Sequence, residues 1–162
     1  MRTSALHMGE TMARPPRLPV VFQEYNPPLY FVTFCTLERR ACLNIKAVHE
    51  AFVKYASAGI QKGAGVGRYV IMPDHVHVFV RGSPGFVLGV WVKGLKRAVG
   101  SSVILPVGHG LWQAGYFDHL IRHSESYAEK WQYVRENPVR KGLVAQAGDW
   151  PFQGEIVRIE SV

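Results

Sequence analysis

The sequence has few of the residues that define secreted and membrane proteins. It holds only 2 cysteines in 162 residues, Cys35 and Cys42, which are too few for a disulfide framework and favour free thiols in a reducing compartment. No apolar run approaches the roughly 20 residues that a membrane-spanning helix needs. No long apolar segment follows the first basic residue, as it would in a signal peptide. We therefore predict a cytoplasmic protein with no membrane partner.

Acidic residues are also scarce, above all in the middle of the chain. The sequence has 19 Lys and Arg against 12 Asp and Glu, which gives a net charge of +7. Between Lys62 and Tyr116 the only acidic residue is Asp74. An uneven positive charge suits a polyanion such as nucleic acid, although ordinary solubilising charge is the plainer explanation. The composition therefore favours a nucleic-acid partner without establishing one.

The periodicity of the chain indicates alternating strands and helices. Residues 29–36 are rich in aromatic and β-branched side chains, as expected for a strand, and residues 45–62 have apolar positions at near-helical spacing. The glycines within 63–67 lack the spacing and the following Lys-Ser/Thr of a phosphate-binding loop, so we expect a flexible connector there. The remaining elements are predicted as strands over 68–72 and 75–81, a helix over 84–100, a strand over 116–122 and a last helix from near Ser124 or Ser126 to Glu136 or Asn137.

This order of elements predicts an α+β fold. It suits a ferredoxin-like, four-stranded antiparallel sheet with helices on one face, plus a late helix. Pro138 ends the late helix, because the residue before a proline avoids the helical region. The length suits one domain, so we expect a single domain over 29–162, with a tail that packs back over the core. Residues 1–28 are predicted to form an extended, basic and proline-rich arm.

Two histidines open the strand that is predicted over 75–81. His75 and His77 alternate with valines, so both imidazoles face the same side of the sheet, about 7 Å apart along the strand. Two neutral imidazoles at this spacing can share a metal ion, although two histidines on a half-buried strand need no metal. A histidine-triad hydrolase would need a third histidine at position 79, which Phe79 occupies.

The late helix presents a phenol and an amide on a face that the core does not use. Tyr127, Trp131 and Val134 have the spacing of a buried stripe. Tyr133 is rotated about 120° from Tyr127, and Asn137 lies one turn further on the same side. A surface aromatic residue and an ordinary helix-end residue are the plainer interpretations. Alternatively, the amide oxygen would add a third metal ligand to the two imidazoles, and the phenol would be a covalent nucleophile for a phosphodiester.

These motifs together resemble those of the single-tyrosine HUH transposases, and the closer match is the branch associated with repetitive extragenic palindromes (REP). His75-Val76-His77 corresponds to the His-hydrophobic-His motif, and Tyr133 to the tyrosine of a late helix. The resemblance covers most of the chain from Tyr30 to Phe152. The supporting segments lie at 70–77, 112–113, 117–122, 133–144 and 149–152.

The resemblance implies a ferredoxin-like, metal-dependent enzyme that nicks single-stranded DNA at or near palindromic hairpins. It implies strand transfer through a covalent 5′-phosphotyrosine, with a free 3′-hydroxyl. By motif position, Tyr133 is the nucleophile. The ligands of a divalent ion, Mg²⁺ or Mn²⁺, are His75, His77 and Asn137, the last of which is a glutamine in some relatives. In the palindrome-associated branch the tyrosine helix folds back onto its own histidines, so we favour a monomer over a domain-swapped dimer.

Basic residues on the helix predicted over 84–100 are the expected DNA contacts. Lys93, Lys96 and Arg97 share its polar side, and we expect them to contact phosphates rather than bases. The alternative function is a non-catalytic nucleic-acid-binding module, which would stack bases on exposed aromatic residues of the same sheet. We favour the nuclease, because the exposed sheet face would carry the two histidines instead. Further expected DNA contacts are Arg39, Arg40 and Arg122.

Overall fold

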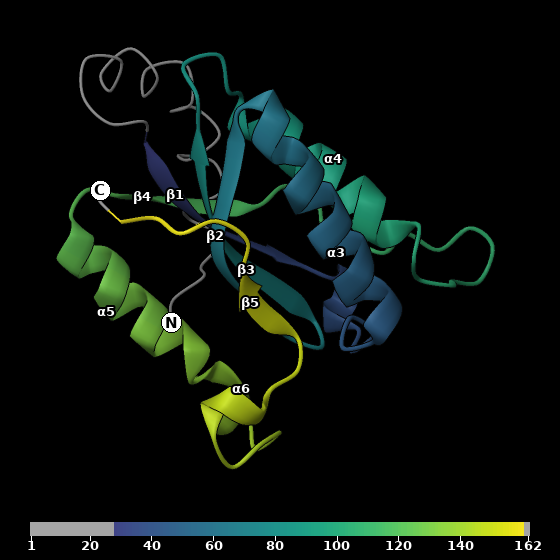
Figure 1. Ribbon diagram of the computed structural model, residues 1–162. Helices are drawn as coiled ribbons and strands as arrows, with labels where there is room; N and C mark the ends of the chain where they lie inside the picture. The colour runs from purple at the N-terminus through teal and green to yellow at the C-terminus, as the bar shows by residue number, and fades with distance from the viewer. Residues whose placement is uncertain (1–27, 161–162) are drawn as a thin grey trace.

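The computed structural model describes residues 28–160, which form an α+β fold (Figure 1). An antiparallel sheet has the strand order β4-β1-β3-β2-β5, with α3 and α4 on one face and α5 on the other. This confirms the predicted fold class, whereas the predicted arm over 1–28 lies outside the described residues except for its last position. The elements are β1 (Leu29–Cys35), the 3₁₀ turn η1 (Leu37–Arg39), α3 (Lys46–Gly59), η2 (Ile60–Lys62), β2 (Ala64–Ile71), β3 (His75–Gly82), α4 (Leu88–Gly100), β4 (Phe117–Ile121), α5 (Ser124–Arg135), α6 (Asn137–Arg140), η3 (Ala147–Asp149) and β5 (Gln153–Glu155).

The register of the sheet places the two histidines of β3 beside the end of β1. His75 is opposite Cys35, and His77 is opposite Thr33, in the antiparallel β1–β3 pair. Side chains alternate between the two faces of a strand, so these four residues point to the same face. Phe31 and Phe79 continue that face and pack against α5. The histidines therefore lie on the side of the sheet that carries the late helix.

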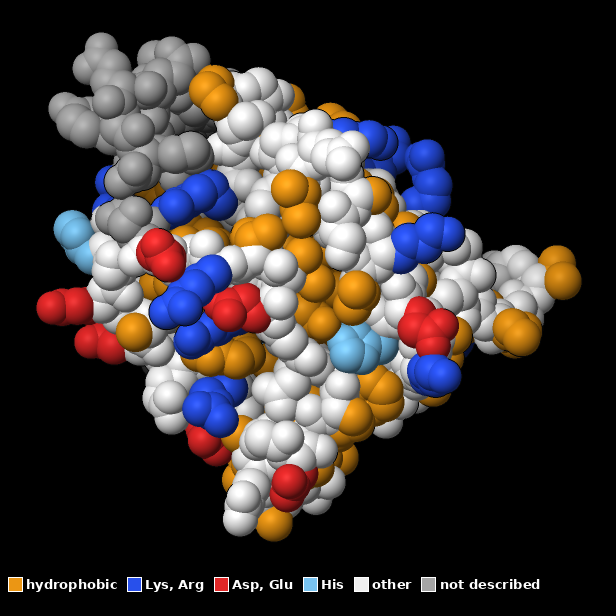
Figure 2. Space-filling model, viewed as in Figure 1, with side chains coloured by type: hydrophobic (Ala, Val, Ile, Leu, Met, Phe, Trp, Pro, Cys, Tyr) orange, Lys and Arg blue, Asp and Glu red, His pale blue; other side chains and the backbone are white. Residues whose placement is uncertain are grey.

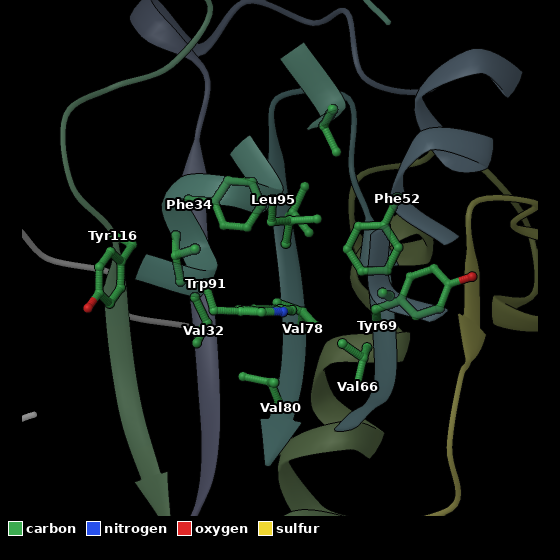
Figure 3. Close-up of a cluster of buried hydrophobic side chains, with 14 of the residues drawn as sticks. Val32, Phe34, Phe52, Val66, Tyr69, Val78, Val80, Trp91, Leu95 and Tyr116 are labelled. Carbon is green, nitrogen blue, oxygen red and sulfur yellow. The ribbon is translucent and has the colours of Figure 1, made fainter. Parts of the chain in front are cut away.

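The larger hydrophobic core lies on the opposite face, between the sheet and α3 and α4 (Figure 3). Val32 of β1 and Val78 of β3 lie on this face with Phe52 of α3 and Leu95 of α4, and all four side chains are fully buried. The helix that we predicted over 84–100 begins only at Leu88, because the preceding proline and glycine form a turn. This core stabilises the sheet without using any residue of the histidine face.

The glycine-rich segment is part of a strand, so the prediction of a flexible connector was wrong. β2 begins at Ala64 and includes Gly65 and Gly67. A Cβ at position 67 would lie 2.8 Å from the Tyr127 hydroxyl and 2.5 Å from Cδ1 of Ile159. The missing side chain therefore lets α5 and the tail approach the strand closely, which is a recurrent use of glycine in sheets. The glycines concealed the strand because they carry no alternating hydrophobic pattern.

The C-terminal tail adds a fifth strand that the sequence did not indicate. β5 pairs antiparallel with β2, and the Trp150 indole donates a hydrogen bond to the Ile71 carbonyl over 3.0 Å. The predicted packing of the tail over the core is confirmed.

Between α4 and β4 a long loop projects from the body, and hydrophobic side chains lie at its tip (Figure 2), where Ile104 and Val107 are fully exposed. Within residues 28–160, no helix combines the length and the apolar character needed to cross a membrane.

Three buried tyrosines predict a loss of stability at alkaline pH. Burial raises the pKa of Tyr30, Tyr69 and Tyr116 to about 12 each. Because an unfolded tyrosine has a pKa of about 10, the stabilising contribution of each neutral phenol is complete below about pH 10 and is lost as the pH rises toward about 12. We expect the free energy of unfolding, measured by urea titration, to fall over this interval, and to fall less steeply in Tyr69→Phe. A free energy independent of pH in this range would contradict the prediction.

Candidate active site

Two imidazoles from β3 and one amide from α6 meet at the end of the late helix. Nε2 of His75 is 3.1 Å from Nε2 of His77, and Nδ2 of Asn137 is 3.1 Å from the first and 3.3 Å from the second. The three residues are 5%, 2% and 8% exposed, respectively. The fold therefore brings together residues that are 60 and 62 positions apart in the chain, as the sequence analysis predicted.

Packing of α5 on the sheet places the amide at this position. Tyr127 and Val134 are buried, and the Tyr127 ring lies 4.8 Å from the ring of Phe79, as expected for the predicted stripe. α5 ends at Arg135, and Asn137 then begins the short helix α6. The apolar stripe thus sets the height of the helix above the sheet, and the change of direction at its end turns Asn137 toward the histidines.

Each imidazole is oriented by a hydrogen bond at its other nitrogen. Nδ1 of His75 donates to Oδ1 of Asp74 over 2.7 Å, because a carboxylate can only accept. Nδ1 of His77 is hydrogen-bonded to Oγ1 of Thr33 over 2.8 Å. Partners of this kind fix the ring orientation in metal-binding histidines and leave Nε2 to face the ligand site. The sequence analysis identified the two rings but not these two partners.

Burial and neighbouring charges set the protonation of the site. Burial lowers the pKa of His77 well below its ordinary value, and the proximity of His75 acts in the same direction. Neutral imidazole is the form that binds a metal ion. The hydrogen bond from His75 holds the pKa of Asp74 well below its usual range, and Arg39 contributes to the same shift. The site therefore contains a neutral His77 and an ionised carboxylate behind His75.

The three side chains fit a divalent metal ion. Two ligands at right angles, each about 2.1 Å from an ion, lie about 3.0 Å apart, which is close to the observed separations of 3.1 and 3.3 Å. Rotation of the Asn137 amide by half a turn would bring its oxygen, rather than its nitrogen, to face the two rings. Among residues 28–160, no group of three His, Cys, Asp or Glu side chains could hold a metal, so a metal at this position would need the amide as its third ligand.

A pocket of about 290 Å³ opens over these groups and includes the predicted nucleophile. Tyr133 lines it from α5 and is 41% exposed. None of the described residues that line the pocket is acidic, whereas three are cationic, so the pocket attracts anions. The lining residues are Thr33, Cys35, Arg39, His75, His77, Tyr133, Asn137, Arg140 and Lys141.

Arg39 reaches the pocket from a strained turn. Glu38 and Arg39 have φ angles of 56° and 55°, in the left-handed region that residues other than glycine seldom adopt. The Arg39 guanidinium donates from Nε to Oδ2 of Asp74 over 2.9 Å and from Nη1 to Sγ of Cys35 over 3.4 Å. Backbone strain of this kind persists where surrounding contacts fix it, often at functional sites. The turn places a cation beside the carboxylate that orients His75.

The basic residues of α4 lie on the opposite side of the sheet from the histidines. Lys93 and Arg97 are exposed, so they can still meet a polyanion there. Lys96 is half-buried, and its ammonium donates to the carbonyls of Gln113 and Gly115 over 2.9 and 2.7 Å. Its ammonium therefore fixes the loop before β4, and a contact of Lys96 with DNA phosphates stays a prediction.

The three further arginines expected to contact DNA have different positions. Arg39 lines the pocket, whereas neither Arg40 nor Arg122 is among the described residues that do. Arg122 follows Ile121, which pairs with Leu29 at the far end of β1 from the histidines. The structure thus brings one of these arginines to the site. Their contacts with DNA remain predictions.

The sequence analysis missed two cations of the pocket, Arg140 and Lys141. A signal was present, because Arg140 is seven residues after Tyr133 and three after Asn137. Residues at these spacings share one side of a helix. The predicted end of the helix at Pro138 stops this pattern short of Arg140. The proline instead occupies the second position of α6, close to where a helix tolerates it best.

Comparison with known proteins places this geometry in context. No family model matches the chain. A REP-associated tyrosine transposase from Escherichia coli K12 is 29% identical over 90 residues, which cover 54% of this chain and 52% of that protein. A Haemophilus influenzae protein named for the same kind of transposase is 40% identical over 43 residues, which cover 26% of this chain and 24% of that protein. The matches therefore span about half and about a quarter of these relatives.

A solved structure has the same overall fold. It is described as a REP-associated tyrosine transposase bound to a REP hairpin, and it matches with a TM-score of 0.65 at 23% identity, over 80% of this chain and 77% of that one. At this identity the likeness establishes the fold alone. Together with the sequence relatives, it confirms the resemblance found in the motifs: the chain is a homologue of proteins named REP-associated tyrosine transposases and shares their fold.

Proposed function

We propose that this protein is a metal-dependent transposase that nicks single-stranded DNA at or near palindromic hairpins and transfers the strand through a covalent phosphotyrosine at Tyr133. The observation that carries the proposal is the single pocket that holds Tyr133 with His75, His77 and Asn137. The names of the relatives support the transposase activity. The hairpin bound to the protein of the same fold supports the DNA partner.

The proposed metal site consists of the two Nε2 atoms and the amide oxygen of Asn137. Mg²⁺ or Mn²⁺ bound there would act as a Lewis acid on the scissile phosphate and would offset charge on its nonbridging oxygens. Nitrogen ligands favour Mn²⁺ in affinity, whereas availability favours Mg²⁺. Thr33 and Asp74 hold the imidazoles in the orientation that such a site requires.

The residues of the pocket have distinct parts in the proposed reaction. The positive charges of Arg39 and Lys141 attract the DNA backbone. The Tyr133 oxygen attacks phosphorus, which forms a tyrosine–phosphate bond and breaks the bond from phosphorus to the 3′-oxygen. The phenol loses its proton to water, and the departing oxygen gains one to become a free 3′-hydroxyl. The covalent link conserves the bond energy, so a hydroxyl of another strand can reverse the step without a further energy source.

The alternative, a non-catalytic module that stacks bases on the sheet, is disfavoured by the position of α5. Phe31 and Phe79 are the central aromatic residues on the histidine face, and they are 5% and 0% exposed. Tyr127 covers Phe79, and Lys130 lies 5.1 Å above the ring of Phe31. A stacking platform needs accessible aromatic faces. On this face the pocket lined by Tyr133, His75 and His77 takes the place of such a platform, which supports the proposal.

We expect metal binding to depend on the three proposed ligands. His75→Ala and Asn137→Ala should each weaken Mn²⁺ binding by at least about tenfold, because loss of even an indirect partner of a metal ligand has an effect of this size. Isothermal titration calorimetry on each variant measures the change, with His109→Ala, on the exposed loop before β4, as the matched control. Equal affinity in wild type and both ligand variants would rule out this site.

We expect a covalent protein–DNA adduct that depends on Tyr133. A single-stranded hairpin labelled at its 3′ end should become attached to wild-type protein in the presence of Mn²⁺, and denaturing electrophoresis detects the adduct. Tyr133→Phe should form none, because it lacks the nucleophilic oxygen. The matched control is Tyr55→Phe, which removes a hydroxyl bonded to the Trp91 carbonyl on the other face of the sheet. Labelled adduct with Tyr133→Phe would identify a different nucleophile.

We also expect a monomer to be competent, because Asn137 meets the histidines of its own chain. Tyr133→Phe mixed with the double variant His75→Ala/His77→Ala should therefore remain inactive in the same nicking assay. A domain-swapped dimer would combine the intact tyrosine of one variant with the intact histidines of the other. Recovery of nicking in the mixture would show a site shared between chains.

A further inference from the structure

The junction of α5 and α6 carries a cation on the same side as the proposed nucleophile. Tyr133, Asn137 and Arg140 follow one another at spacings of four and three residues, so they share one side of the helical path. The Arg140 amide donates over 2.9 Å to the carbonyl of Glu136, the residue between α5 and α6. Arg140 therefore lies in the first turn after the junction, and its side chain folds back toward Tyr133.

Arg140 contacts Tyr133 in two ways. Its guanidinium carbon lies 4.0 Å from the centre of the phenol ring, within the range of a cation–π contact. Its Nη1 also donates to the backbone carbonyl of Tyr133 over 2.8 Å. The hydrogen bond fixes the guanidinium relative to the backbone, and the ring contact fixes the phenol relative to the guanidinium. The two contacts together link the orientation of the ring to that of its own helix.

The core leaves the Tyr133 ring partly exposed, so contacts outside the core contribute to its orientation. Tyr133 is 41% exposed and lies off the buried stripe of α5. An exposed side chain on a helix can occupy more than one rotamer, and in this structure Tyr133 lines the pocket. None of the described pocket-lining residues is a carboxylate that would draw Arg140 away from the ring.

We propose that Arg140 is a positioning residue, which holds the Tyr133 phenol in the rotamer that faces His75, His77 and Asn137. This inference rests on the proposed function for its kinetic consequence, whereas the position of the ring can be measured without any DNA. The planar guanidinium can cover the ring and donate to the carbonyl at once. Lysine keeps the charge but is a compact point donor, so it cannot do both.

The first measurement reports the ring directly. 3-Fluorotyrosine placed at position 133 of the full chain gives one ¹⁹F resonance, whose shift depends on what covers the ring. We expect the resonance to move in both Arg140→Ala and Arg140→Lys. The resonance should stay in place in the matched control Arg158→Ala. This variant also removes one arginine, but the native Arg158 pairs with Glu160 on the exposed tail. An unchanged resonance in both Arg140 variants overturns the proposal, whatever the nicking result.

The second measurement separates positioning from charge. With saturating labelled hairpin and Mn²⁺, single-turnover adduct formation should slow about tenfold or more in both Arg140 variants, since a misplaced reacting group can cost up to about a hundredfold. The dissociation constant for the same hairpin should change far less. Restoration of the wild-type rate by Arg140→Lys would show a purely electrostatic role and overturn the proposal. Absence of nicking by the wild-type protein would contradict the proposed function instead. The ¹⁹F result would then decide by itself whether Arg140 positions the Tyr133 ring.

Discussion

The burial of two imidazoles side by side on one sheet face is the constraint on which the rest of the site depends. A buried polar group without a hydrogen-bond partner lowers the stability of the fold by about 1 to several kcal/mol. His75 and His77 meet this requirement through Asp74 and Thr33 at Nδ1 and through Asn137 at Nε2. The amide of Asn137 must therefore lie at the same end of the sheet as the two imidazoles. Because only Glu136 separates Asn137 from α5, the helix has to end there as well.

The two faces of the sheet are covered by different helices and have different roles in the fold. On one face, α3 and α4 bury the valines of β1 and β3 in a continuous apolar core (Figure 3). On the other, α5 covers Phe31 and Phe79 and leaves the ends of β1 and β3 open to the pocket. The C-terminal tail holds this second layer from the side, through the bond from Trp150 to the Ile71 carbonyl. The first face thus carries the larger core, and the second face leaves the pocket open at its end.

Positive charge is used in two different ways in this chain. Lys96 lies in the acid-poor central segment, yet it donates to two backbone carbonyls and so stabilises a loop. Arg39 and Arg140 come from outside that segment and reach the pocket, one from a strained turn and the other from α6. Thr36 helps to hold the strained turn, because its hydroxyl bonds the Arg40 carbonyl. Local bonding thus places these cations in different parts of the fold, with Lys96 on a loop and Arg39 and Arg140 at the pocket.

The sequence by itself determined most of the elements and the faces on which the candidate site residues lie. Alternation placed His75 and His77 on one face, and helical spacing separated Tyr133 and Asn137 from the buried stripe, because both are properties of a single strand or helix. Only the tertiary structure decided which groups meet across elements: the Thr33 partner of His77, the commitment of Lys96 to carbonyls, and the return of Arg140 over Tyr133. It also made Gly65 and Gly67 part of a strand, since a close approach of Tyr127 to Gly67 depends on a residue 60 positions away rather than on any local pattern.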